Sequence, residues 1–196
     1  MIGFDDLAFR ISEQEEDDRG LGRWSIITIT GKNGLKTTFI TCYCPVVSAS
    51  PGSAYAQQLV YMAEQKGCIP DNIVCPRQMF GYDLRRTIGK YSNIGNQLIV
   101  CGDFNSEYLT LSEWFLDEGL QDIIAQKHGK MPITYQRSKK DPLDCVFGTP
   151  SIKIKMEDVS HLVNLSAITE GYGLIYQMRH YLGSIHSKYL IQRQED

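Results

Sequence analysis

A short apolar segment that ends in a glycine and two polar residues constrains the fold of this chain more than any other feature. Residues 97–101 are almost wholly apolar, which is typical of a strand buried on both faces of a sheet. After Gly102 stand Asp103 and Asn105, and strand alternation puts their side chains on one face, with Phe104 on the other. The carboxyl end of such a strand opens to a cleft. The equally weighted alternative is an Asx-rich turn that only closes the strand.

The chemistry of this pair points to hydrolysis at phosphorus. An aspartate in a cleft can take a proton from water or orient the water. An asparagine beside it can donate to an oxygen that gains charge during phosphoryl displacement. We therefore predict catalytic roles for Asp103 and Asn105.

Two further side chains are candidates for the same site. Asp144 places a carboxylate in the apolar segment 142–148, where burial is costly unless the group is paired, hydrogen-bonded or near a cation. Its structural alternative is an aspartate that bonds to backbone at the entry of a strand. Tyr43, just before Cys44-Pro45, stands at the end of another predicted strand and could contact a phosphate through its hydroxyl. A half-buried packing role is the slightly favoured alternative for this tyrosine.

The rest of the chain alternates between strand and helix patterns, which predicts an α/β fold with antiparallel character. A hairpin is expected first, with a turn at 31–34 that contains Asn33 and Gly34. The acidic run 13–18 is expected to be a solvated loop. The remaining predictions are strands at 23–30, 36–43, 133–135 and 143–147, and helices at 54–66, 76–91, 109–117 and 120–127.

Composition limits the class of protein further. The 196 residues suit one domain, and 42% hydrophobic with 22% charged residues indicates a globular chain. A net charge of −3 excludes a uniformly basic surface but allows a local basic groove. No apolar run is long enough for a membrane span, and the six cysteines form no CxxC pair, so we expect reduced thiols and an intracellular protein, nuclear or cytoplasmic.

The order of these motifs resembles the endonuclease/exonuclease/phosphatase superfamily. The resemblance is carried by Tyr-x-Pro at 43–45, Gly-Asp-Phe-Asn at 102–105, Thr-Tyr at 134–135 and Leu-Asp-x-Val-Phe-Gly at 143–148. It covers about Gly22 to Pro150 and is nearest to the endonuclease domains of retrotransposons and to apurinic-site endonucleases.

This resemblance implies a four-layer α/β sandwich and phosphodiester hydrolysis with Mg²⁺ or Mn²⁺. By position, Asp103 would activate water, Asn105 would stabilise the transition state, Asp144 would orient a histidine or help hold metal or water, and Tyr43 would contact the phosphate. The partner implied is nucleic acid, DNA before RNA, bound by a monomer with no membrane association. No metal ligand is assigned outright.

The chain departs from the family at both ends. The family has an Asn and a metal-binding Glu before the region where this chain begins, and Glu13, Glu15 and Glu16 are poor substitutes. The family also ends in Ser-Asp-His, whereas His161 here follows Ser160. We therefore expect residues 1–20 to be disordered or a partial strand, 21–155 to be an incomplete domain, and 156–196 to be an atypical tail.

A shifted reading frame offers one explanation for the tail. Codons that encode residues 167–170 can be chosen so that the shifted frame reads Asp-His-Arg, and extending this over 156–177 restores an apolar strand. We expect the tail from about Glu157 to be out of frame, which sequencing of the transcript would test. The expected function is thus metal-dependent phosphodiester hydrolysis, impaired in this chain. The alternatives are a non-catalytic remnant or binding module, and a phosphatase of a small phosphorylated substrate.

Overall fold

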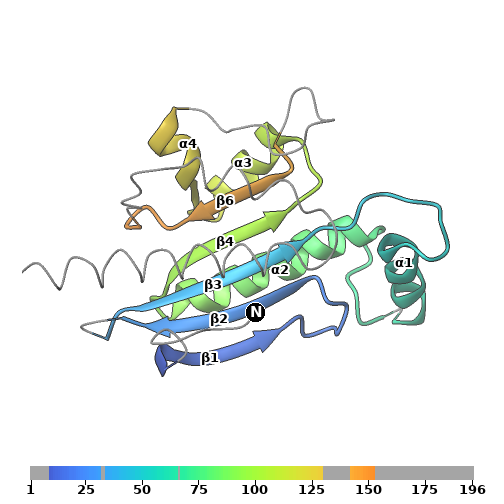
Figure 1. Ribbon diagram of the computed structural model, residues 1–196. Helices are drawn as coiled ribbons and strands as arrows, with labels where there is room; N and C mark the ends of the chain where they lie inside the picture. The colour runs from blue at the N-terminus through green and yellow to red at the C-terminus, as the bar shows by residue number, and fades with distance from the viewer. Residues whose placement is uncertain (1–8, 32–33, 66, 130–141, 153–196) are drawn as a thin grey trace, which may run out of the picture.

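The structure, a computed structural model, describes residues 9–31, 34–65, 67–129 and 142–152 (Figure 1). Strands and helices alternate along the chain after an initial run of three strands. The strands are β1 (Ile11–Glu16), β2 (Trp24–Thr30), β3 (Lys36–Tyr43), β4 (Gln97–Asp103), β5 (Gln121–Asp122) and β6 (Asp144–Gly148). The helices are α1 (Ala54–Glu64), α2 (Pro76–Asn93), α3 (Tyr108–Asp117) and α4 (Ile123–His128).

The six strands form one mixed sheet in the order β1-β2-β3-β4-β6-β5. The pair β3–β4 is parallel, and every other neighbouring pair is antiparallel. A parallel pair needs a crossover connection, which α1 and α2 supply between β3 and β4. The α/β class with antiparallel character is as predicted, and the four-layer arrangement stays a prediction.

The predicted hairpin of β2 and β3 is present. Trp24 pairs with Cys42, and Thr30 pairs with Lys36 at the turn. Gly34 has a φ of 74°, a conformation that glycine adopts without steric cost. Residues 32–33 of the turn lie outside the described residues. The predicted strands 23–30 and 36–43 are confirmed within a residue.

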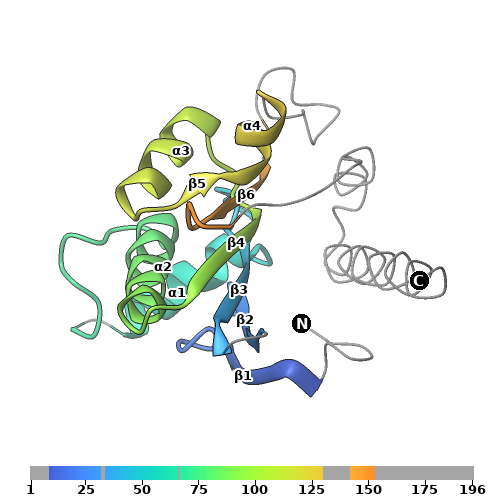
Figure 2. The same ribbon diagram turned by 90° about the vertical axis from the view of Figure 1, so that its left-hand side faces the viewer.

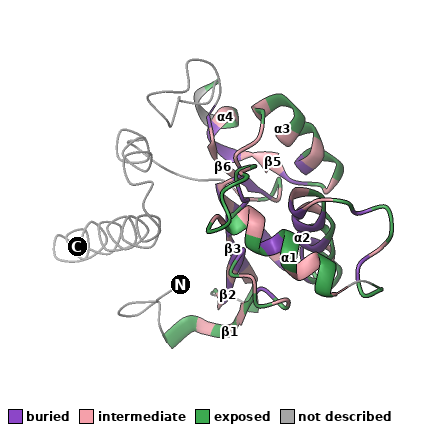
Figure 3. Ribbon diagram, turned by 90° about the vertical axis from the view of Figure 1, so that its right-hand side faces the viewer, coloured by how far each residue is buried: buried purple, intermediate pink, exposed green. Residues whose placement is uncertain are grey.

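Helices α2 and α3 pack on one face of the sheet and bury the core there (Figure 2). Buried positions gather in the central strands and along α2, as Figure 3 shows. Three phenylalanines meet in this core. The ring centroids of Phe104 and Phe115 are 5.3 Å apart, and those of Phe115 and Phe147, which are stacked, are 4.0 Å apart. The residue that separates Asp103 from Asn105 is thus an anchor in the core.

The acidic run 13–18 was predicted to be a solvated loop, and this prediction is wrong. Residues Ile11–Glu16 form β1, an edge strand antiparallel to β2 in which half-buried and exposed positions alternate. Charged side chains on an edge strand discourage further strand pairing, so an acidic composition is compatible with this position. Asp17, at the end of the run, is buried and bonded to Arg23.

Several predictions fall outside the described residues: the strand at 133–135, the tail from about Glu157, and the histidines at 161, 180 and 186. The helices at 54–66, 76–91 and 109–117 are confirmed within a few residues, and the segment 120–127 divides into β5 and α4. None of the helices in the described part of the chain combines the length and hydrophobicity that a membrane span requires.

Candidate active site

Three of the four predicted site residues stand in one row across the sheet. Tyr43 is the register partner of Asp103 between β3 and β4, and Asp103 is the register partner of Asp144 between β4 and β6. Directly opposite residues on neighbouring strands point to the same face, with Cβ atoms about 5 Å apart. The neighbouring positions Cys42 and Cys145 belong to the helix-covered core, so the row faces the other side of the sheet.

Asp103 has a strongly perturbed carboxyl group. Burial and, second to it, the negative charge of Asp144 raise the pKa of its carboxyl from 3.8 to about 6. Hydrogen bonds from the backbone and side chain of Asn105, and the positive charge of Arg77, oppose this rise. A carboxylate with a pKa displaced toward neutrality by a second carboxylate is typical of functional sites.

The alternation of side chains along a strand does not explain the position of Asn105. Strand β4 ends at Asp103, and Asn105 adopts a φ of 46°, in the left-handed region. Its backbone N–H donates to Asp103 Oδ1 at 3.1 Å, and its Nδ2 donates to the carbonyl of Cys44 at 2.9 Å. The Asx turn that was weighed as an alternative is therefore present, and it is what brings the amide beside the carboxylate.

Tyr43 is partly exposed, which fits both a packing role and a contact with a ligand. Its side chain is 44% exposed at the end of β3, so it can reach a ligand from solvent. Partial burial and the nearby Asp103 raise the pKa of its phenol, so the hydroxyl remains a hydrogen-bond donor at neutral pH. Its contact with a phosphate stays a prediction.

Backbone bonds hold the three strand ends together. The N–H of Cys44 donates to the carbonyl of Asp103 at 2.8 Å, and the N–H of Phe104 donates to the carbonyl of Leu143 at 3.0 Å. Asp144 is the first residue of β6 and is half-buried. Asp144 therefore lies at the entry of a strand, as its structural alternative expects, and it is also a member of the row.

The carboxylate pair fits part of a divalent metal site. In residues 9–31, 34–65, 67–129 and 142–152, no group of three or more His, Cys, Asp or Glu side chains could hold a metal ion. Mg²⁺ often binds proteins through one or two carboxylates and completes its coordination with water and substrate phosphate oxygens. Asp144, with Asp103 beside it, supplies donors of that kind.

Arg77 and Ser106 adjoin the site but were not found from the sequence. The Arg77 guanidinium donates to the carbonyls of Pro45 and Phe104 and to Ser106 Oγ. Ser106 Oγ in turn donates to the carbonyl of Phe104 at 3.0 Å. The only signal in the sequence was the position of Arg77 after Pro76, at a predicted helix start, and that position does not reveal its distant partners.

No family model matches the chain, and no curated protein matches it. Solved structures do: an endonuclease/exonuclease/phosphatase family protein from Leptotrichia buccalis C-1013-b has a TM-score of 0.43 at 19% identity, covering 74% of this chain and 52% of that one. The APE2 catalytic domain of Xenopus laevis has a TM-score of 0.40 at 15% identity, over 66% of this chain and 46% of that one.

An AP endonuclease from Archaeoglobus fulgidus is similar with a TM-score of 0.39 at 16% identity, over 74% of this chain and 58% of that one. The chain thus spans about half the length of the solved structures that it matches.

Proposed function

We propose that the row Tyr43, Asp103 and Asp144, with Asn105, is a hydrolytic site that cleaves a phosphodiester with the help of a divalent cation. One observation carries the proposal. Two carboxylates face each other at adjacent strand ends, and Asp103 has a pKa raised to about 6 by burial and by Asp144. A fold maintains such a destabilising pair most readily where the pair has a function.

Asp103 is suited to act on a water molecule. A general base works best when its pKa lies near the operating pH, because it is then ionised but still basic. With a pKa of about 6, Asp103 is mostly ionised at neutral pH and is a stronger base than an ordinary aspartate. It would take a proton from the attacking water or hold that water in line with the phosphorus atom.

The other members of the row would act on the substrate. Asn105 holds an amide group beside the Asp103 carboxylate, where it can donate to a phosphoryl oxygen that gains charge. Tyr43 would donate from its exposed hydroxyl to a phosphate oxygen. Asp144 would orient the water or help to hold the cation. A bound Mg²⁺ or Mn²⁺ would polarise the phosphoryl oxygens.

Nucleic acid is the substrate class that we propose, with DNA ahead of RNA. The motifs at 43–45, 102–105 and 143–148 resemble those of apurinic-site and retrotransposon endonucleases, and this supports a diester rather than a monoester. Turnover is expected to be slow, because the described residues supply two carboxylates rather than a full set of metal ligands.

A comparison of two small substrates tests the proposed reaction. We expect Mg²⁺-dependent hydrolysis of bis-p-nitrophenyl phosphate, a diester, to exceed that of p-nitrophenyl phosphate, a monoester, and to stop in EDTA. Asp103→Asn should abolish the activity. Asp71→Asn, which removes an exposed carboxylate outside the site, should leave it unchanged.

Each alternative function has its own outcome in this experiment. A preference for the monoester would favour a phosphatase. Hydrolysis that survives Asp103→Asn would exclude this site as its source. An absence of hydrolysis in a folded protein that still binds DNA would favour a binding module.

A further inference from the structure

The peptide unit between Phe104 and Asn105 is held at both of its polar ends. The Phe104 carbonyl accepts hydrogen bonds from Arg77 Nη2 at 3.4 Å and from Ser106 Oγ at 3.0 Å, and the Asn105 N–H donates to Asp103 Oδ1 at 3.1 Å. Asn105 has a φ of 46°, a conformation that is uncommon for residues other than glycine. Asparagine tolerates this conformation better than most residues, but it still costs free energy, so the contacts around this peptide unit decide whether Asn105 keeps it.

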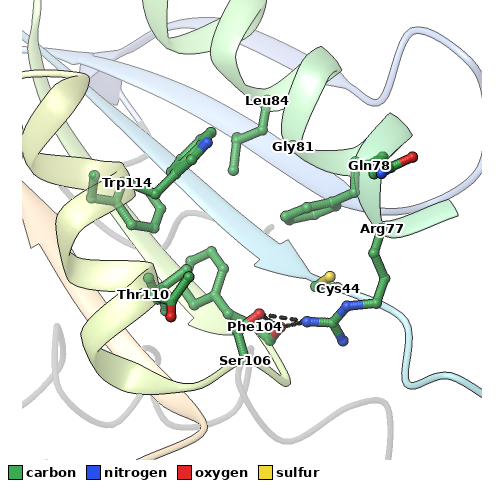
Figure 4. A pocket seen from close by; sticks show the side chains of 12 residues that line it. Cys44, Arg77, Gln78, Gly81, Leu84, Phe104, Ser106, Thr110 and Trp114 are labelled. Carbon is green, nitrogen blue, oxygen red and sulfur yellow. Dashed lines mark hydrogen bonds between the residues drawn. The ribbon is translucent and has the colours of Figure 1, made fainter. Parts of the chain in front are cut away.

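Arg77 connects the two loops that carry the site. Besides the Phe104 carbonyl, its guanidinium donates to Ser106 Oγ in the loop after β4 (Figure 4). It also donates to the carbonyl of Pro45, 3.3 Å away, in the loop after β3. A planar guanidinium presents several N–H groups in fixed directions, so one side chain can hold three acceptors in a set geometry.

We infer that Arg77 is a positioning residue of the site, which holds the Phe104–Asn105 peptide so that Asn105 stays in its left-handed conformation beside Asp103. The inference rests on the proposed function, because it assigns Arg77 a role in that site. Arg77 acts from the helix side of the sheet through backbone groups. It belongs to the first turn of α2, which packs against β4 and is therefore a fixed support.

A pocket on the helix side makes this arrangement accessible to experiment. The pocket has a volume of about 270 Å³, and its lining includes Cys44, Arg77, Phe104 and Ser106 (Figure 4). Shortening Arg77 to alanine would extend the pocket to the carbonyl that Arg77 now holds. A free guanidinium ion could enter there and donate to the same oxygen atoms.

The first test is the NMR spectrum of Arg77→Met, which keeps the length of the side chain but removes its donors. We expect the backbone and side-chain amide signals of Asn105 and the backbone signals of Ser106 to shift, with the Asn105 coupling constants reporting a changed φ. Signals from β1 and β2 should stay in place. Arg86→Met is the matched control, because Arg86 is exposed on the same helix and its guanidinium lies 6.0 Å from the Tyr82 ring rather than at the site loops.

The second test is chemical rescue. In Arg77→Ala, guanidinium chloride at a non-denaturing concentration should return the Asn105 signals toward their wild-type positions, and sodium chloride at equal ionic strength should not. Arg77→Lys should restore them only in part, because an ammonium group lacks the planar fork. A merely structural role for the arginine would not produce rescue that distinguishes these two salts.

The outcomes separate this inference from the proposed function. Unchanged Asn105 signals in a folded Arg77→Met protein would overturn the inference, whether or not the wild type hydrolyses diesters. If the arginine variants do not fold, unshifted Asn105 signals in Ser106→Ala, which lacks both an acceptor for Arg77 and a donor to the Phe104 carbonyl, would overturn the inference. Where hydrolysis is measurable, Arg77→Met should lower kcat on the order of 100-fold with little change in KM.

Discussion

At Gly102 the backbone has a φ of 155°, and a Cβ atom there would point into the neighbouring strand β3. A Cβ atom built there would lie 1.9 Å from the carbonyl oxygen of Cys42 and 2.7 Å from its carbonyl carbon. The obstacle is backbone of the neighbouring strand, which cannot move without parting β3 from β4.

Replacing this glycine should therefore cost stability. We expect Gly102→Ala to lower the free energy of unfolding by about 3 kcal/mol, as overpacking against a rigid neighbour does, in urea denaturation. Gly89→Ala in helix α2 is the control, because a Cβ atom there meets nothing within 4 Å. This alanine should raise the free energy of unfolding by up to about 1 kcal/mol. Equal stability of Gly102→Ala and wild type would contradict the described strand contact.

The charge on Asp103 should destabilise the fold at neutral pH. Burial and Asp144 raise its pKa to about 6, whereas an unfolded aspartate has a pKa of about 3.9. The folded state therefore holds its proton more tightly. The resulting stabilisation is complete below about pH 4 and is lost as the pH rises through the folded pKa of about 6.

Asp103→Asn should accordingly melt at a higher temperature than wild type at neutral pH in EDTA. The difference should shrink as the pH falls toward about 4, where wild-type Asp103 is protonated as well. Asp71→Asn should show no comparable gap, because Asp71 is exposed. A lower melting temperature for Asp103→Asn at neutral pH would mean that this carboxylate is stabilised rather than strained.

At the scale of elements, a buried ionic cluster fastens helix α2 to the turn between β1 and β2. Arg23 bonds to Asp17 through Nε at 2.7 Å and lies 3.0 Å from Asp83 of α2, and Arg19 bonds to the same Asp83 at 2.6 Å. The side chains of Arg23 and Asp17 are each 1% exposed. Breaking one partner of such a cluster leaves another charge buried without compensation.

Asp83→Ala should thus lower the free energy of unfolding by about 3–5 kcal/mol, measured in urea. Lys90→Ala is the matched control on the same helix, because Lys90 forms an ion pair with Glu15 at the surface, where such pairs contribute about 0–1 kcal/mol. If both variants showed the same small decrease in the free energy of unfolding, the buried cluster would not be what holds α2 against the turn between β1 and β2.

The sequence predicts secondary structure best where a pattern is compatible with a single structure. The β-branched segments on either side of Asn33-Gly34 specify a hairpin, and the apolar segment before Gly102 specifies a central strand. The sequence did not separate the edge strand β1 from a solvated loop, because its side chains are half-buried or exposed and no hydrophobic pattern marks it. Local hydrophobic patterns indicate which side chains are buried, and few side chains of an edge strand are buried.

The candidate site was predictable in membership but not in geometry. Asp103, Asn105, Asp144 and Tyr43 were selected by residue type and motif, and the structure brings them together. The left-handed turn at Asn105 could not be read from alternation, which fails where a strand ends. The contacts of Arg77 depend on how α2 lies across β3 and β4, which is a property of the tertiary fold.

At the scale of the whole molecule, the described strands form one sheet whose two faces differ in the residues that they carry. The face under α2 and α3 holds the aromatic core, and the other face carries the row Tyr43, Asp103 and Asp144. Phe104 belongs to the first face, while its neighbours in sequence belong to the site. The site is therefore built directly on the most buried part of the fold, which suits groups that must keep a fixed geometry.

Nicking of supercoiled plasmid DNA tests the central claim, that this row of side chains cleaves phosphodiesters, most directly. We predict slow conversion to the open circular form with Mg²⁺, none in EDTA, none with Asp103→Asn, and an unchanged rate with Asp71→Asn. Folded wild-type protein that leaves the plasmid intact, or an Asp103→Asn variant that nicks as fast as wild type, would contradict the claim.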